Sequence, residues 1–319
     1  WTDGAENISF ADDTNSVISS PSEIEVLKKL EHEAKNILDY MLANELMANA
    51  GNTGCMCLGE NGGFKKISIK VGDDIIDSCE DFHLLGMKID CNMNWSSHIN
   101  ELCATLRQRL CILKQLKSKL PGELLKIVAD GLFMSKLRYG IAIYSKVRIN
   151  ESDPTTQQMK HLQTLQNRMI RILIGKRLED RVNMEDASIR LILSVNRLAC
   201  YHTLMETFKI IHYGKTTEMY KALTENRSES SMRTRTADKN LLNIIPYHQN
   251  RNKGFIQRCA ELWNVLPEDV RNCSKESSFK NSQAIADSLS LNSLLTNDLV
   301  DLDELAKSID IAKQWLPDI

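Results

Sequence analysis

The sequence predicts an α+β fold in which a small β-hairpin region precedes a mostly α-helical remainder. Short alternating apolar runs, bounded by Gly and Asp, are concentrated in the first 95 residues. From about residue 96, apolar residues instead recur three or four positions apart, as on one face of a helix. The chain has 319 residues, of which 42% are hydrophobic and 26% charged, so we expect a globular protein of one to three domains.

The first predicted element is a β-hairpin whose tight turn is the segment Phe-Ala-Asp-Asp at 10–13. Apolar residues approach and leave it, among them Ile8 and Val17. Adjacent carboxylates at a hairpin tip are candidate ligands for a divalent metal ion, so Asp12 and Asp13 are candidate site residues. The alternative is an ordinary acidic turn, because Asp favours turns.

A helix is predicted over 22–43, with Ser22 and Glu25 as a capping box and apolar residues at helical spacing. Alternation at 67–71, Gly72 in a turn and a return at 75–76 predict two paired strands. A further short strand is predicted over 84–89.

The helical part begins at Ser97, where one apolar stripe runs to Leu116 and Arg107, Lys114 and Lys117 fall outside it. Pro121 is predicted to start a second helix that continues toward Tyr144. Further helices are predicted over 155–175, ending near Gly175, and over 185–213. The apolar residues expected to carry the second helix are Leu124, Leu125, Val128, Leu132 and Leu137.

The C-terminal third is less regular. Residues 214–252 are polar and predict a partly disordered linker with one short amphipathic piece. A compact helix is predicted over 255–266, where Pro267 stops it. Residues 281–319 combine an apolar repeat with an acidic background, which fits either a helix that binds a protein partner or a simple packed helix.

Charge is segregated along the chain although the net charge is only −2. Residues 1–99 carry 7 basic and 17 acidic side chains, whereas residues 100–180 carry 15 basic and 7 acidic ones. A basic middle beside an acidic, metal-capable first segment favours a nucleic-acid enzyme. The alternative is that the basic side chains only form solvated helix faces.

The nine cysteines are odd in number and lack paired spacing, which predicts reduced, mostly buried thiols in an intracellular protein. The pair Cys55-x-Cys57 has no nearby partner motif, so zinc is not expected. No apolar run is long enough to span a membrane, and no signal peptide is visible. The first residue is Trp, so we expect a fragment, and the sequence does not distinguish nucleus from cytoplasm.

Several short motifs occur in a fixed order. They are FADDT at 10–14, FHLLGMKID at 82–90, WSSHI at 95–99, RYG at 138–140, LQNR at 165–168, WNVLP at 263–267 and SFK at 278–280. In this order they resemble the second half of the reverse transcriptases of non-LTR retrotransposons (LINE elements), especially the jockey-like ones. The resemblance covers roughly residues 1–280. Together with the composition of the chain, it predicts four regions within that part, at 1–95, 96–213, 214–254 and 255–280, and an acidic tail at 281–319.

The resemblance implies that 1–95 is the C-terminal part of a polymerase palm and that 96–213 is a helical, thumb-like region. It implies template-directed DNA synthesis with an RNA template, a DNA primer, dNTP and Mg²⁺ (or Mn²⁺). Asp12 and Asp13 would then be catalytic metal ligands. The hairpin with Leu85 and Gly86 would grip the primer, and Arg107, Lys114 and Lys117 would contact nucleic-acid phosphates.

Two departures limit what the resemblance implies. The family's first catalytic Asp lies on an upstream strand that is absent here together with the fingers. The loop after the palm helix places Asn52 where the family has a Lys, so either Lys65 or Lys66 serves from nearby or the gene is decaying. We therefore expect that the chain alone does not polymerise. The alternatives are a non-catalytic nucleic-acid-binding module or an inert retrotransposon relic.

Four conspicuous side chains receive structural interpretations. Trp95 and Trp263 are expected to pack in the core, and His98 is expected to be a helix-start residue rather than a ligand. Tyr139 is expected to be a buried aromatic residue with a hydrogen-bonded hydroxyl rather than a platform for a nucleic-acid base.

Overall fold

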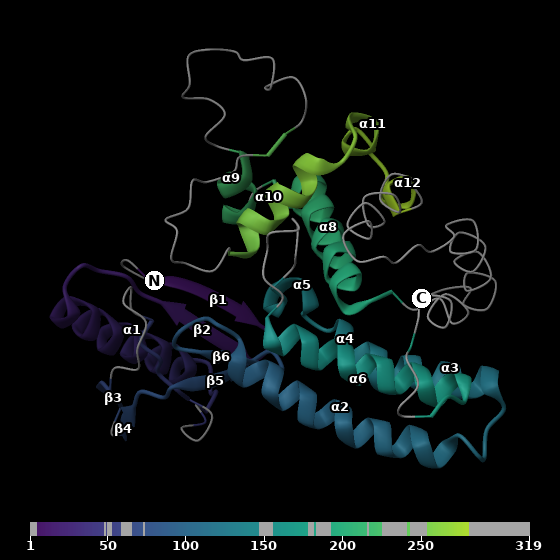
Figure 1. Ribbon diagram of the computed structural model, residues 1–319. Coiled ribbons are helices and arrows are strands. Elements are labelled where there is room, and N and C mark those ends of the chain that lie inside the picture. The colour runs from purple at the N-terminus through teal and green to yellow at the C-terminus, as the bar shows by residue number, and fades with distance from the viewer. Residues whose placement is uncertain are drawn as a thin grey trace. The chain divides into compact units, whose positions relative to one another are not determined.

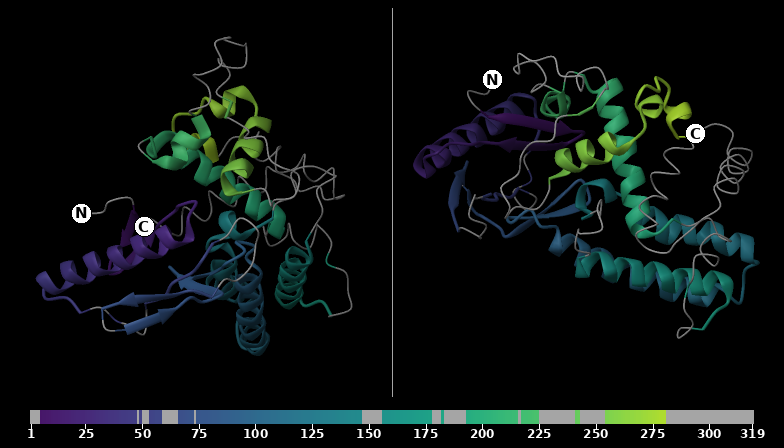
Figure 2. Two further views of the ribbon diagram at one scale, coloured as in Figure 1. Left: turned by 90° about the vertical axis from the view of Figure 1, so that its left-hand side faces the viewer. Right: turned by 45° about the horizontal axis from the view of Figure 1, so that its top comes forward.

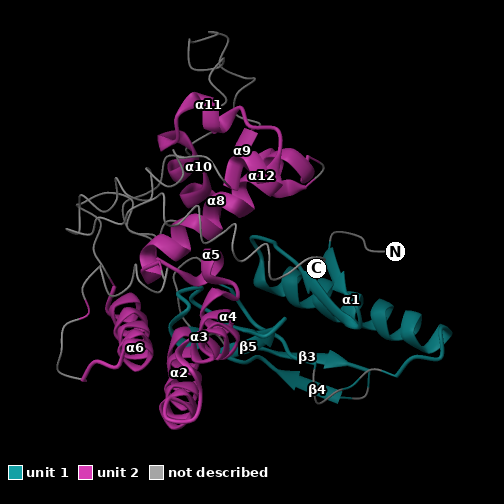
Figure 3. Cartoon of the chain, turned by 90° about the vertical axis from the view of Figure 1, so that its right-hand side faces the viewer, with its two compact units in different colours: residues 1–98 teal, residues 99–319 magenta. Residues whose placement is uncertain are grey.

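The computed structural model describes residues 5–47, 49, 53–58, 66–72, 74–146, 156–177, 182, 193–215, 217–224, 241–242 and 254–280. The predicted α+β class is confirmed, because three small antiparallel sheets precede a helical remainder (Figure 1). The chain divides into two compact units, unit 1 at 1–98 and unit 2 at 99–319 (Figure 3).

Unit 1 contains three separate two-stranded sheets and one long helix. Polar contacts tie the helix to two of the sheets: the Asn7 amide donates to Glu33 at 2.7 Å, and the Lys70 backbone N–H donates to Glu31 at 3.1 Å. The elements are β1 (Glu6–Phe10), β2 (Asp13–Val17), α1 (Glu23–Ala43), β3 (Ser68–Val71), β4 (Asp74–Asp77), β5 (Asp81–Leu84) and β6 (Met87–Asp90).

The apolar core of unit 1 is small. Its buried hydrophobic residues, among those that the structure describes, are Cys55, Ile69, Met87 and Cys91. Within residues 5–47 the one buried side chain is the carboxylate of Glu33. Hairpin β1–β2 and helix α1 therefore contribute no fully buried apolar side chain to this core.

Two local predictions in unit 1 need correction. The capping box is wrong: Ser22 does precede α1, but its side chain makes no cap hydrogen bond. Glu25 instead accepts from the Ser20 hydroxyl at 2.7 Å and pairs with Lys29 at 2.7 Å. The single strand over 84–89 is also wrong, because β5 and β6 pair as a hairpin with a turn at 85–86, as the family resemblance implied.

Unit 2 is helical in all its described elements. Helix α2 begins at the end of unit 1 and continues into unit 2. The elements are α2 (Ser96–Leu116), α3 (Gly122–Ala129), the π-helical turn η2 (Asp130–Met134), α4 (Ser135–Arg138), α5 (Ile141–Tyr144), α6 (Gln157–Ile174), α8 (Val195–Tyr213), α9 (Glu218–Thr224), α10 (Phe255–Val265), α11 (Glu268–Arg271) and α12 (Glu276–Lys280).

The prediction of one continuous helix from Pro121 to Tyr144 is wrong in two places. The turn η2 widens the helix, and Gly140, with a φ of 66°, separates α4 from α5. A π turn advances the helix by more residues than an α turn and so shifts the face that later residues occupy. The buried face begins with Leu125, Ala129 and Phe133, whereas Leu124 is half exposed.

The core of unit 2 includes a column of stacked rings from three helices. Trp263 of α10 stacks on Phe279 of α12 with centroids 5.5 Å apart, and Phe279 stacks on Phe208 of α8 at 4.5 Å. His212, one turn later in α8, continues the column at 4.1 Å from Phe208. Figures 1 and 2 show α10 lying against α8, and the core packing predicted for Trp263 is confirmed.

The predicted linker contains ordered pieces that belong to the core. Leu223 in α9 is buried, and Leu242 is buried where its backbone exchanges two hydrogen bonds with the Asn264 amide, at 2.7 and 2.9 Å. The tail at 281–319 and residues 225–240 lie outside the described residues. No helix in the described part of the chain is long and apolar enough to cross a membrane.

Candidate functional site

Asp12 and Asp13 lie at the tip of hairpin β1–β2, so the predicted hairpin is confirmed. Phe10 pairs with Asp13, which leaves Ala11 and Asp12 as the two-residue turn. Ala11 has a φ of 53°, in the left-handed region that side chains with a β-carbon seldom adopt. Both carboxylates are exposed, and they project from consecutive residues of one short turn.

The hairpin turns its polar face toward α1. The Asn7 amide bonds to Glu33 of α1, and the Ser16 hydroxyl donates to Asn7 on the same face. Side chains alternate between faces along a strand, so Ile8 and Phe10 lie on the opposite face. They are 61% and 64% exposed, and Val17 beside them is 50% exposed. The described part of the chain leaves this apolar face exposed.

The carboxylates of Asp12 and Asp13 suit a hard divalent cation, because Mg²⁺ prefers oxygen ligands and often takes only one or two carboxylates from the protein. They fit as a partial ligand set. Within the described residues, no group of three or more His, Cys, Asp or Glu side chains is placed to hold a metal ion. A complete two-metal site therefore needs a further carboxylate from another segment.

Leu85 and Gly86 form the two-residue turn between β5 and β6. Both have positive φ, at 47° and 75°, as a type I′ hairpin turn requires. Gly adopts this conformation freely, whereas Leu does so at a cost. The Leu85 side chain is 43% exposed at the tip of the hairpin. A strained, exposed apolar side chain is unusual in a position where Asn is preferred.

We predict that Leu85→Asn stabilises unit 1 by about 1 kcal/mol, because Asn tolerates the left-handed region better than Leu. Urea denaturation of the full chain measures the change, and Leu58→Asn, at another exposed leucine in a loop, is the control. A loss of stability in Leu85→Asn would show that contacts of the leucine outweigh its backbone strain.

The start of α2 is fixed by polar contacts from hairpin β5–β6. The buried Asp90 carboxylate accepts the backbone N–H groups of Asn92 and Asn94, each at 3.2 Å. His98 is buried in the first turn of α2 and accepts the Lys88 N–H at 3.2 Å, so its interpretation as a helix-start residue is confirmed. These contacts fix the first turn of α2 within unit 1.

Helix α2 carries the three residues that were predicted to contact phosphates. Arg107, Lys114 and Lys117 are exposed, and none of them forms an ion pair with another described residue. Arg107 and Lys114 are seven residues apart, which places them on one side of the helix about 10 Å apart along its axis. Arg109 differs, because its guanidinium donates to the Leu132 carbonyl in η2.

Three other basic side chains of unit 2 are neutralised locally. Lys209 pairs with Glu206 at 2.8 Å, Lys280 pairs with Glu276 at 2.7 Å, and Lys221 pairs with Glu218. The exposed cations at the end of α2 therefore stand apart from those of α8, α9 and α12. An accessible cation without a carboxylate partner is suited to an external anion.

Three further basic residues have the same character, although they were not among the predicted phosphate contacts. Lys119 follows α2, and Lys160 and Arg168 lie on α6; all are exposed and have no ion pair among the described residues. The signal was present, because the apolar stripe predicted for 155–175 leaves both α6 residues on the opposite side.

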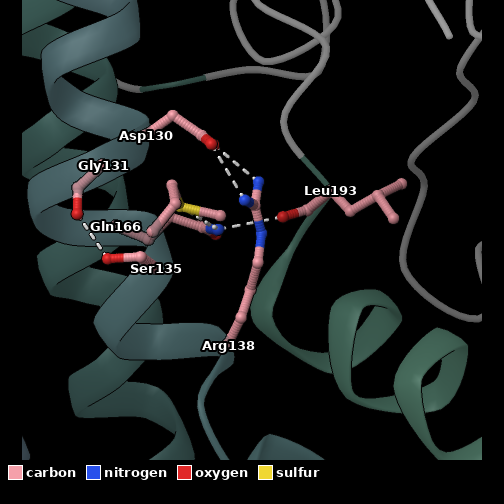
Figure 4. Close-up of polar contacts among 7 residues, drawn as sticks. Asp130, Gly131, Ser135, Arg138, Gln166 and Leu193 are labelled. Carbon is pink, nitrogen blue, oxygen red and sulfur yellow. Dashed lines mark hydrogen bonds and ion pairs between the residues drawn. The ribbon is translucent and has the colours of Figure 1, made fainter. Parts of the chain in front are cut away.

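The motif Leu165-Gln166-Asn167 has a structural role (Figure 4). The Gln166 side chain is fully buried, and its amide donates to the Leu193 carbonyl at 2.9 Å and contacts the Met134 sulfur at 3.9 Å. Gln163, one turn earlier, accepts the Val195 N–H at 2.8 Å. These two amides attach α6 to the beginning of α8. Figure 4 also shows Arg138 reaching across η2 to Asp130, with bonds of 2.7 and 3.0 Å.

Two aromatic predictions need correction. Tyr139 is 50% exposed, so it is not buried; the buried tyrosine is Tyr144, whose hydroxyl donates to the Leu137 carbonyl at 2.6 Å. Burial raises the pKa of Tyr144. Trp95 is only half-buried, with its ring edge-on to His98 at 6.4 Å.

The cysteines and the lysines near residue 65 were also the subject of predictions. All nine cysteines are free thiols, and five are buried. Burial raises the pKa of Cys55, Cys103, Cys200 and Cys259, so these thiols are poor nucleophiles. Lys66 pairs with Asp77 at 3.2 Å, while Asn52 and Lys65 lie outside the described residues.

No family model, curated protein or solved structure matches this chain. The structure places the candidate residues in two groups. Asp12 and Asp13 share one turn of unit 1, with the Leu85–Gly86 turn in the same unit, whereas Arg107, Lys114 and Lys117 share the basic side of α2 in unit 2. The function must therefore be inferred from local geometry and from the order of the sequence motifs.

Proposed function

We propose that this chain is part of an RNA-directed DNA polymerase of the non-LTR retrotransposon type, in which unit 1 supplies part of the palm and α2 binds the RNA–DNA duplex. The observation that carries the proposal is the order of three features. An acidic two-residue hairpin turn comes first, a second hairpin with a strained turn follows, and a helix with unpaired basic side chains leaves directly from it.

The uncovered apolar face of β1–β2 supports the palm assignment. A two-stranded hairpin is marginally stable by itself and normally gains its stability from a larger sheet or a packed helix. Ile8, Phe10 and Val17 form a surface that a neighbouring element of a complete polymerase would cover. That element would also supply the further carboxylate that the metal site needs.

In the proposed enzyme Asp12 and Asp13 would hold the divalent ions. When bound, such ions would activate the primer 3′-hydroxyl and neutralise charge on the leaving pyrophosphate. Ala11 keeps the turn narrow, since its methyl group lets the backbone approach the primer end. The cations of α2 would hold the duplex by its phosphates, which is a sequence-independent contribution.

Binding to an RNA–DNA duplex tests the thumb assignment. We expect Arg107→Gln/Lys114→Gln/Lys117→Gln to lower affinity by on the order of 10-fold or more at about 100 mM salt and to reduce the salt slope by about 2 to 3. The matched control is Lys209→Gln/Lys221→Gln/Lys280→Gln, which removes the same charge from cations that are already paired. Equal losses in the two triple variants would contradict a specific interface on α2.

Primer extension tests the palm assignment. With an RNA template, a DNA primer, dNTPs and Mg²⁺, we expect no product from this chain alone, because two carboxylates do not complete a two-metal site. Product that disappears in Asp12→Ala would show that the site is complete within the 319 residues. Product that persists in that variant would remove Asp12 from the mechanism.

A non-catalytic nucleic-acid-binding module is the second candidate function. Two observations favour it. The basic side chains of α2 are exposed and need no further residue to bind an anion, whereas the carboxylates of Asp12 and Asp13 form only a partial set of metal ligands. Duplex binding that is independent of Mg²⁺ and unaffected by Asp12→Ala would favour this candidate.

A further inference from the structure

The exposed side of α2 combines positive charge with accessible apolar surface. Arg107, Lys114 and Lys117 are unpaired among the described residues, and Cys111 is exposed between the first two of them. Ile112, beside Cys111, is 45% exposed. A partner that matches this surface must be acidic and must offer some apolar side chains.

The C-terminal segment of the same chain has this composition. Residues 281–319 carry 7 acidic and 2 basic side chains. Four of the acidic residues fall within seven positions and alternate with leucines at 299, 302 and 305; they are Asp298, Asp301, Asp303 and Glu304. The segment at 298–305 is therefore complementary to the side of α2 in charge and carries the apolar side chains that the surface requires.

The chain that leads to segment 298–305 is long compared with helix α2. Seventeen residues lie between Lys280 and Asp298, and the chain from one to the other can span up to about 60 Å when extended. Helix α2, with 21 residues, is only about 32 Å long. A segment tethered in this way has a high effective concentration at the surface of the same molecule, so weak contacts suffice to occupy it.

We propose that the acidic segment 298–305 docks on the basic side of α2 and competes there with nucleic acid. The competition rests on the proposed function, because it presumes that α2 binds a duplex. The docking is intramolecular and autoinhibitory: a duplex must displace the acidic segment before it reaches Arg107, Lys114 and Lys117. Salt weakens both interactions because both are contacts between exposed charges.

Neutralising the segment tests the competition. In the full chain, Asp298→Asn/Asp301→Asn/Asp303→Asn/Glu304→Gln is expected to raise affinity for an RNA–DNA duplex by about 5-fold at about 50 mM salt, since removal of a tethered competitor frees the site. The control changes the same charge at exposed acidic residues of unit 1: Glu6→Gln/Asp39→Asn/Glu45→Gln/Asp74→Asn. An increase of equal size in the control would overturn the proposal, since it would reflect net charge alone.

Carbodiimide cross-linking tests the docking without nucleic acid. We expect an amide between Lys114 or Lys117 and a carboxylate at 298–304, mapped by mass spectrometry in the monomer band. If this cross-link forms but the chain does not bind a duplex, the docking is supported and the proposed function is rejected. Duplex binding without the cross-link, or a cross-link confined to dimers, would overturn the intramolecular docking.

Discussion

Trp263→Ala is expected to lower the free energy of unfolding of unit 2 by about 3 to 5 kcal/mol, the range for removal of a large buried aromatic side chain. Trp263 is 1% exposed and begins the column of rings that joins α10, α12 and α8. Its removal leaves a cavity beside Phe279 and takes away a stacking partner. Urea denaturation, monitored by far-ultraviolet circular dichroism, measures the loss of stability.

Val265→Ala is the control for Trp263→Ala, because Val265 lies on the same helix and is 62% exposed. Its effect should stay within about 0.5 kcal/mol, as for most surface substitutions. A loss below about 1 kcal/mol for Trp263→Ala would mean that the ring column does not hold the three helices together.

Arg258→Met is expected to cost about 3 kcal/mol, because it leaves the carbonyl groups of Ala142 and Ile143 without their charged donor. The Arg258 guanidinium donates to the carbonyls of Ala142 and Ile143, both at 2.9 Å. It thus joins α10 to α5, more than 100 residues earlier in the sequence. Burial lowers the pKa of Arg258, yet arginine keeps its charge in proteins, so the pair of bonds persists at neutral pH.

Arg168→Met provides the comparison for Arg258→Met, since Arg168 is exposed on α6. It should change stability by less than about 0.5 kcal/mol. Denaturation of both variants in the same buffer gives the difference. Similar values for the two would show that solvent satisfies the α5 carbonyls as well as Arg258 does.

The sequence predicted best those elements that have one apolar face and clear ends. In helix α6 the Thr156 hydroxyl accepts the Met159 N–H, and Gly175 at the end of the helix has a left-handed conformation. Its predicted apolar face is buried and includes Leu162, Leu165, Met169, Ile170 and Leu173. The apolar spacing, the N-terminal cap and the C-terminal glycine are all local features and all predict the same helix. Tertiary contacts therefore did not change the predicted structure. The hairpin at Asp12 and Asp13 was predictable for the same reason.

The errors occur where a local pattern has competing solutions. Apolar spacing does not reveal a π turn. Nor does it decide between adjacent leucines, and the structure buries Leu125 while Leu124 is half exposed. Gly140 redirects the chain, and for that reason Tyr144 rather than Tyr139 is buried. Alternation in a strand separates two faces but does not say which one meets the helix, so the polar face of β1–β2 toward α1 could not be predicted.

That outward apolar face also bears on how accurately the carboxylates of Asp12 and Asp13 are held. A catalytic group must stay within about 0.5 Å of its working position, and this rigidity comes from packed neighbours. Hairpin β1–β2 has no buried side chain among its described residues, so its tip is free to fluctuate. In the proposed metal site, unit 1 would thus supply two carboxylates but not their fixed placement, which would depend on the element that covers Ile8, Phe10 and Val17.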